Sequence, residues 1–333
     1  MVTKPCAVGI DVGGTYLKGG LVDAEGRIHA RVRVATPASG PGLSIISTIV
    51  NVGRTLSRQG KDAGYRVEGV GVAMPHYSVG SDWVQTYCSN LPSLEGFALR
   101  PPLVNAFGES IACEFDTNAA ALAEYRFGAA VGSARALVMV IGTGISCGIV
   151  VDGGTLLRYT FGTAGETGHI IVEPEATERC SAGCRGCLES IASASAIRKA
   201  GIAAAAAGTS VALAVRSARG DLDSAAVSRA AEAGDPVAIR IIERAGTAVG
   251  IALTSLLHIY CPDVIVLGGG VSAAGEALVA PARRVLDATA APFFLKRLRR
   301  LRLSPMGPDA GLVGAASLIL VTPHVQRIES GTR

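Results

Sequence analysis

The chain contains 333 residues, of which 49% are apolar and only 5% aromatic, and its formal net charge is +4. This length allows two domains, while so small a charge gives no reason to expect a nucleic-acid partner. The sequence shows neither the run of about 18 apolar residues that a membrane helix needs nor a recognisable signal peptide. We therefore expect a cytoplasmic protein with neither nucleic acid nor membrane among its partners.

The first part of the chain alternates apolar strands with helices. A tight turn at 24–26 indicates a hairpin, and residues 74–92 are predicted to be irregular. A short strand from Ile111 ends at Asp116 and turns directly into a helix. The predicted strands are 6–10, 16–22, 27–34, 66–73 and 111–116, and the predicted helices are 43–59, 99–107 and 119–127.

The second part repeats the opening plan of strand, glycine-rich turn, strand, tight turn and strand, at 135–141, 145–151 and 155–158. A loop-rich stretch at 161–188 follows. The remaining predictions are helices at 189–200, 209–218, 223–232 and 236–260, a strand at 263–267, and helices from about 274 and at 310–321. Such alternation predicts α/β layers with helices on the sheet faces, and the repeat predicts two related units with a ligand cleft between them.

The first candidate site is the turn Asp11-Val12-Gly13-Gly14-Thr15, followed by Lys18. Paired glycines allow backbone N–H groups to approach phosphate oxygens closely. Thr15 adds a hydroxyl, and Asp11 is suited to hold Mg²⁺ through water. An ordinary glycine hairpin is the alternative, because short motifs of this kind recur by chance.

Two further glycine turns follow strand ends. Gly142-Thr143-Gly144 repeats the first turn in the second unit, and Gly268-Gly269-Gly270 lies between a strand and a helix. A flat backbone at the latter turn suits a nucleotide base or ribose; an ordinary strand-to-helix turn is the alternative. Two Gly-Thr turns in one chain indicate a phosphate site more specifically than one does.

Asp116 is the candidate catalytic acid, because a carboxylate at a strand end beside a helix start is well placed to accept a proton. The alternative interpretation of Asp116 is a helix N-cap. Which of these two roles Asp116 has depends on the residues that surround its carboxylate.

Taken together, these motifs resemble those of the ROK family of sugar kinases, in the actin-like ATPase superfamily. The resemblance runs from Asp11 to about residue 320. It rests on the segments 11–15 (Asp-Val-Gly-Gly-Thr), 114–120 (Glu-Phe-Asp-Thr-Asn-Ala-Ala), 165–169 (Gly-Glu-Thr-Gly-His), 186–189 (Gly-Cys-Leu-Glu) and 311–316 (Gly-Leu-Val-Gly-Ala-Ala).

The resemblance implies an α/β chain with the two-domain actin-like ATPase (ribonuclease H-like) fold and a ligand cleft between the domains. Residues 1–117 plus about 310–333 are predicted to form the N-terminal domain, on the sugar and phosphate side. Residues 118–309 are predicted to form the C-terminal domain, with the nucleotide side, the metal loop and a helical insert. A homodimer is expected.

The same resemblance implies an ATP- and Mg²⁺-dependent kinase in which Asp116 deprotonates a primary sugar hydroxyl. Phosphoryl transfer of this kind depends mainly on positioning and charge neutralisation. The nucleotide and metal would lie against the three glycine turns. The predicted sugar-binding residues are Asn90, Phe115, Glu166, His169 and Glu189.

A structural zinc site is also implied, although its loop departs from the family pattern. Ala182 stands where the family has its second Cys, and Cys184 supplies a thiol two residues later. We expect His169, Cys180, Cys184 and Cys187 to bind Zn²⁺ and to fix the loop that carries Glu189. Free thiols in a rearranged loop are the alternative.

The substrate pocket departs from the family as well. Phe115 replaces an Asn that contacts ring hydroxyls in family kinases, and His76 follows Pro75 where a Gly is usual. Losing a hydrogen-bonding group changes sugar discrimination strongly. We therefore expect a modified substrate, such as an aminohexose (kanosamine or glucosamine), a deoxy sugar or a cyclitol, with an ordinary glucokinase as the alternative.

Two alternative functions from other classes of protein are a sugar-sensing ROK regulator and a sugar-binding protein that has lost catalysis. ROK repressors carry a DNA-binding region ahead of the first phosphate motif, whereas ten residues precede Asp11 here. The presence of Asp116 and of both Gly-Thr turns favours catalysis. The basic run at 296–302 is interpreted as a solvated helix end that leads into a strand. A face that binds nucleic acid or a membrane is the alternative.

Overall fold

The computed structural model describes residues 4–75, 77–88, 90–158 and 166–320. His76 and Gly165, singled out in the sequence, lie outside the described residues. The chain divides into two compact units: Met1–Gly132, Gly148–Ala164 and Asp309–Arg333 form the first, and Ser133–Cys147 with Gly165–Pro308 form the second. This division differs from the predicted domain boundary, because residues 118–132 and 148–164 belong with the first unit.

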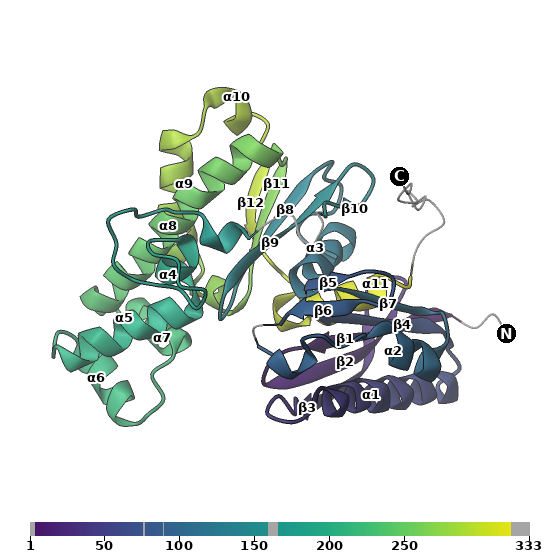
Figure 1. Cartoon of the computed structure of the whole chain (residues 1–333). Helices are drawn as coiled ribbons and strands as arrows, with labels where there is room; N and C mark the ends of the chain where they lie inside the picture. Colours follow the sequence, from purple (N-terminus) through teal and green to yellow (C-terminus); the bar gives the residue numbers. More distant parts are fainter. Residues whose placement is uncertain (1–3, 76, 89, 159–165, 321–333) are drawn as a thin grey trace. The chain divides into compact units, whose positions relative to one another are not determined.

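The first sheet has the strand order β3-β2-β1-β4-β7 (Figure 1). Its first three strands are antiparallel neighbours, and β4 and β7 continue the sheet in parallel with β1. The predicted strands of this unit are confirmed to within a few residues. They are β1 (Pro5–Val12), β2 (Tyr16–Asp23), β3 (Ile28–Ala35), β4 (Arg66–Met74) and β7 (Ile111–Phe115).

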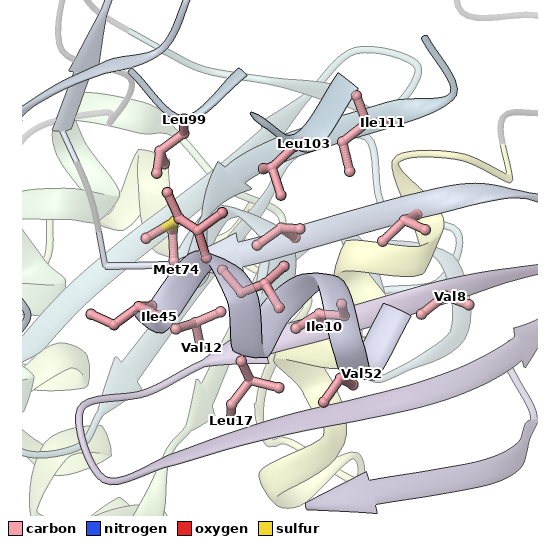
Figure 2. Packing of buried hydrophobic residues seen from close by; sticks show 14 of the residues in the cluster. Val8, Ile10, Val12, Leu17, Ile45, Val52, Met74, Leu99, Leu103 and Ile111 are labelled. Carbon is pink, nitrogen blue, oxygen red and sulfur yellow. The ribbon is translucent and has the colours of Figure 1, made fainter. Parts of the chain in front are cut away.

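One face of this sheet carries the main hydrophobic core, under α1 (Gly42–Asp62) and α2 (Arg100–Phe107). Helix α1 is amphipathic and buries residues at helical spacing. Every second residue of β1 points into the same core, as strand geometry requires. Figure 2 shows Val8, Ile10 and Val12 of β1 beside Ile45 and Val52 of α1 and Leu103 of α2.

The other face is covered by α3 (Asp116–Phe127) and α11 (Ala310–Ser317), which pack on each other. Their approach is so close that it depends on glycines. A Cβ on Gly71 of β4 would lie 1.8 Å from the carbonyl oxygen of Ala315, and one on Gly314 would lie 1.7 Å from that of Ala119. Helix α11 therefore joins the first sheet despite its distance in sequence.

Replacing Gly71 with Ala is expected to destabilise the first unit by about 3 kcal/mol or more, because the added methyl group collides with backbone that cannot move alone. Denaturant unfolding with circular dichroism measures the loss. Gly270→Ala is the matched control, since a Cβ there meets no atom within 4 Å. Equal midpoints for both variants would contradict the packing described for α11.

The second sheet has the order β10-β9-β8-β11-β12, which repeats the plan of the first. In each sheet, three strands that are consecutive in sequence lie side by side at one edge. The other two strands, each reached by a crossover connection, lie toward the opposite edge. Strand β11 is parallel to both β8 and β12. The predicted duplication is thus confirmed by the strands β8 (Ala136–Ile141), β9 (Ile145–Val151), β10 (Thr155–Leu156), β11 (Val264–Gly268) and β12 (Arg300–Leu303).

Polar N-caps set the starts of several helices in the second unit. The side chains of Ser193, Ser210, Asp223 and Asp235 each accept a hydrogen bond from a backbone N–H of the first turn. The helices are α4 (Leu188–Ala192), α5 (Ala194–Ala206), α6 (Val211–Ala218), α7 (Ser224–Glu232), α8 (Pro236–Tyr260), α9 (Glu276–Thr289) and α10 (Pro292–Leu295).

The structure corrects several predicted elements. The helix expected at 189–200 is broken at Ser193, which caps a new helix extending through the alanine tract. The stretch expected to be irregular contains a small hairpin of β5 (Tyr77–Val79) and β6 (Val84–Tyr87), whose strands are too short to show a clear alternation. The closing helix α11 ends at Ser317, earlier than expected.

Among the described residues, no single helix combines the length and apolarity needed to cross a membrane. On length and composition alone, the pair α5 and α6 passes that test jointly, with a bend of 103° between them.

Candidate active site

Two carboxylates come together at one edge of the first sheet. Asp11 lies near the end of β1, and Asp116 begins α3 directly after β7. Burial raises the pKa of Asp116 to about 6, and the negative charge of Asp11 adds to the increase. A carboxyl group with this pKa is ionised near neutrality and still basic enough to accept a proton.

Asp116 is held by its neighbour and does not cap the helix. Its Oδ1 accepts hydrogen bonds from the Thr117 backbone N–H at 2.7 Å and from the Thr117 hydroxyl at 3.2 Å. The N-cap position of α3 belongs to Phe115, and no side-chain cap hydrogen bond is formed there. The capping interpretation of Asp116 therefore does not describe this structure.

Asp11 is fixed from two sides. Lys18 Nζ lies 3.2 Å from its Oδ2, and the carboxylate packs against Gly311 in the first turn of α11. Burial raises the pKa of Asp11, while Lys18 opposes that increase. An acid placed in this way is suited to a cation, which would relieve the burial of its charge.

The first glycine turn lies beside Asn90. The Gly13 N–H donates to the Tyr16 carbonyl at 3.0 Å, and the Thr36 hydroxyl donates to the Gly13 carbonyl at 2.7 Å. A Cβ on Gly14 would lie 3.3 Å from the Cβ of Asn90, whose own side chain is exposed. The structure thus brings a predicted phosphate turn and a predicted sugar ligand together.

An ion pair between the buried Glu114 and the exposed Arg158 was not predicted. Arg158 donates to Glu114 Oε2 through both Nε, at 2.9 Å, and Nη2. Asn118 donates to the other oxygen of Glu114 at 2.9 Å. The short spacing of Glu114 and Asn118 across the junction of β7 and α3 was the available signal for the amide, whereas nothing near Arg158 in the sequence marks it as a partner.

Phe115 stands between Glu114 and Asp116 in the sequence and has an aromatic neighbour. It is 8% exposed, and its ring centroid is 5.5 Å from that of Tyr77, with the ring planes tilted by 47°. The residue that replaces the family Asn therefore belongs to an aromatic pair one position before the candidate base.

In the second unit, two glycine turns are neighbours at the carboxyl edge of the second sheet. Gly142 accepts a hydrogen bond from the Ala194 N–H at 2.8 Å, which ties that turn to the start of α5. Gly269 has φ +85°, and a Cβ there would lie 2.4 Å from the Ile141 carbonyl oxygen. Only glycine combines this conformation with so close an approach.

Glu189 connects the second glycine turn to the cysteine loop. Its Oε2 accepts from the Ile145 N–H at 3.1 Å, and its Oε1 accepts from the Ser181 hydroxyl at 3.0 Å. A Cβ on Gly144 would lie 2.7 Å from Oε2, so a larger residue at this position would force the carboxylate to shift.

Glu166 and His169 lie near Glu189. Glu166 Oε2 is 3.7 Å from His169 Nε2. Burial raises the pKa of Glu166; His169 opposes that increase and Glu189 adds to it. The three predicted polar residues of the second unit therefore form one group.

The predicted metal ligands also come together. His169, Cys180, Cys184 and Cys187 each offer a ligand atom, and these atoms lie within 4.8 Å of one another. In a tetrahedral zinc site, ligand sulfur and nitrogen atoms are about 3.5–3.8 Å apart. The Nδ1 of His169 lies 3.7 Å from the Cys180 sulfur. The donor set fits Zn²⁺, with Cys184 compensating for Ala182.

Arg244 of α8 braces this loop and was not predicted. Its Nη2 donates to Glu173 Oε2 at 2.6 Å, and its Nη1 donates to Glu178 Oε1 at 2.8 Å. Both acids lie between His169 and Cys180 in sequence. Because the Arg is 66 or more residues away, no local pattern could reveal the contact.

Comparison with known proteins extends these observations. The ROK family model matches residues 7–321. The glucokinase of Thermotoga maritima is 32% identical over 315 residues, which cover 94% of this chain and 96% of that protein. A kanosamine kinase of Amycolatopsis mediterranei is 31% identical over 271 residues, covering 81% and 82% of the two chains.

A solved structure agrees with these matches. The ROK family glucokinase from Streptomyces griseus, in complex with glucose and AMPPNP, has a TM-score of 0.76 and 31% identity, with 94% of this chain and 98% of that chain covered. The predicted family, fold class and enzyme class are confirmed. The chain therefore belongs to the ROK family, as an ATP-dependent sugar kinase with the two-domain actin-like ATPase fold.

Proposed function

We propose that this kinase phosphorylates the primary hydroxyl of a hexose-like sugar and that Asp116 is the general base. The observation that carries the proposal is the raised pKa of Asp116, caused by burial and by Asp11. The carboxylate accepts the hydroxyl proton as the sugar oxygen attacks the terminal phosphoryl group of ATP.

The glycine turns and Asp11 are proposed to hold the phosphates and the metal. Backbone N–H groups of 13–15 and 142–144 suit phosphate oxygens, and Lys18 adds a positive charge. The turn at 268–270 is proposed for the nucleoside. Mg²⁺, when bound, neutralises phosphate charge, and Asp11 is the residue placed to hold it through water.

The sugar hydroxyls are proposed to bind Asn90, Glu166, His169 and Glu189. Carboxylates and an amide provide the acceptors and donors that a polyol requires. His169 fits a double role, since a ring nitrogen on a metal leaves the other nitrogen for a hydroxyl. The cysteine cluster supports a structural Zn²⁺ that fixes this histidine and the loop bearing Glu189.

We further propose that the natural substrate is an aminohexose or another sugar with an altered ring hydroxyl. Phe115 cannot donate or accept a hydrogen bond, and its pairing with Tyr77 makes this position apolar. A relative named kanosamine kinase supports this substrate class. The relatives named glucokinase support ordinary glucose as the second candidate.

Replacing Phe115 with Asn is expected to raise kcat/KM for glucose relative to that for an aminohexose by about 10-fold or more, because a polar partner for a ring hydroxyl is restored. A coupled assay of ADP release over glucose, glucosamine, kanosamine and a cyclitol measures the ratio in both proteins.

Phe115→Leu serves as the control, since it removes the ring and adds no polar group. If Phe115→Asn and the unchanged protein show the same substrate profile, Phe115 does not determine specificity. If glucose is the best substrate of the unchanged protein, the aminohexose proposal is wrong and the second candidate holds. The expected homodimer and cytoplasmic location stay predictions from the family resemblance and the sequence.

A further inference from the structure

A hollow lined by several charged residues lies in the second unit, away from the glycine turns. It has a volume of about 570 Å³, within the range of small-molecule sites. Its wall contains four basic side chains and a single acid. These are Arg135, Lys296, Arg297, Arg299 and Asp263.

The hollow lies at the amino edge of the second sheet. Arg135, Asp263 and Arg299 each directly precede a strand, namely β8, β11 and β12. These three strands are parallel, so the residues meet at one edge, whereas Gly142 and Gly268 lie at the opposite ends. A strand of five or six residues separates the two edges by about 17–20 Å. The hollow is therefore distinct from the candidate active site.

Asp263 holds backbone groups of the hollow in place, and the basic residues of the hollow outnumber this one acid. Its Oδ1 accepts from the Arg135 N–H at 2.8 Å, and its Oδ2 accepts from the Ala134 N–H at 3.3 Å. Its backbone carbonyl accepts from the Arg299 N–H at 2.8 Å. The acid thus fixes the backbone of two of the four basic residues, while backbone amides satisfy its own oxygens.

The remaining cations of the hollow are Lys296, Arg297 and Arg299. Within the described part of the chain, Lys296, Arg297 and Arg299 form no salt bridge. Arg297 is nevertheless held in place, because its guanidinium lies 3.8 Å from the centroid of the Phe293 ring and its Nη1 donates to the Phe293 carbonyl at 3.2 Å. Like charges gathered on a fixed frame repel one another, so a multiply charged anion would be stabilising here.

We propose that this hollow binds a small phosphate compound carrying two or more negative charges. Guanidinium groups match phosphate oxygens with paired hydrogen bonds, and an ammonium group adds a point charge. The concave shape and size favour a small molecule over a nucleic-acid strand, which would follow an extended basic surface. The basic run of the sequence, first interpreted as a solvated helix end, supplies three of the four cations.

The test is a calorimetric titration of the full chain with pyrophosphate. The double variant Lys296→Glu/Arg299→Glu is expected to lose one binding site that the unchanged protein has, or to bind there at least 10-fold more weakly. The glycine turns of the active site also suit phosphates, so only the difference between the two titrations reports on the hollow.

Arg219→Glu/Arg240→Glu carries the same charge change at two exposed positions outside the hollow and should titrate like the unchanged protein. Sugar kinase turnover of the double variant should be unchanged without pyrophosphate, which confirms that it is folded. Identical titrations for the double variant and the unchanged protein would overturn the proposal. An equal loss in the control variant would also overturn it, since the effect would then reflect net charge.

Discussion

Asp116→Asn is expected to lower kcat for sugar phosphorylation by about 10²–10⁴-fold, the usual contribution of a general base. The amide keeps the shape of the side chain and can still accept the hydrogen bonds from Thr117. It cannot accept the hydroxyl proton. Sugar affinity, measured by calorimetry, should change by only a few-fold, because the sugar contacts proposed for Asn90, Glu166, His169 and Glu189 remain.

The same variant should be more stable than the unchanged protein at pH 7. The folded chain raises the pKa of Asp116 to about 6, so ionisation at neutral pH favours the unfolded state. This penalty is on the order of 1–3 kcal/mol above pH 6, and it disappears as the pH falls toward the pKa of the unfolded chain. A variant that is both inactive and destabilised at pH 7 would indicate a structural role for Asp116. A fully active variant would remove Asp116 from the mechanism.

Cys184→Ser is expected to release zinc and to lower kcat/KM for the sugar by about 10–100-fold, as the loss of groups that orient a site commonly does. Cys184 is the most informative position to test. It lies two residues after Ala182, which stands where the family has its second Cys, so its role as a ligand is specific to this chain's spacing. Metal content by atomic emission and turnover are measured on the same sample.

Cys261→Ser is the matched control, since its thiol lies outside the cluster of four ligands. It should retain one zinc per chain and full turnover. Retention of zinc by Cys184→Ser would show that this thiol is not a ligand. Absence of zinc from the unchanged protein would show that the cysteines are free thiols in a rearranged loop.

Most of the fold could be predicted from the sequence because its elements are locally encoded. Strands β1, β2 and β3 show apolar runs separated by a glycine turn and a hairpin, and helix α8 has an Asp cap followed by Pro. Helices that break at a cap, such as α4 and α5 at Ser193, are harder to predict, since alanine-rich sequence continues through the break. The domain boundary differs because it depends on contacts that no local pattern encodes.

The candidate site shows the same limit. Asp11, Asp116 and the cysteine cluster follow from residue type and spacing. The partners that hold them do not, because the pairs Glu114–Arg158 and Arg244–Glu173 join residues 44 and 71 positions apart. Long-range ion pairs depend on the finished packing. The resemblance to a family located the chemistry, and the structure supplied the groups that support it.

The most direct test of the account is the pH dependence of kcat/KM for the phosphorylated sugar, measured with saturating ATP and Mg²⁺. Asp116 must be ionised to act as a base, and burial together with Asp11 raises its pKa to about 6. The account predicts that kcat/KM is constant above this pH and falls about tenfold per pH unit below it. A rate that stays constant from pH 7 down to pH 5 would contradict the assignment of Asp116 as the general base.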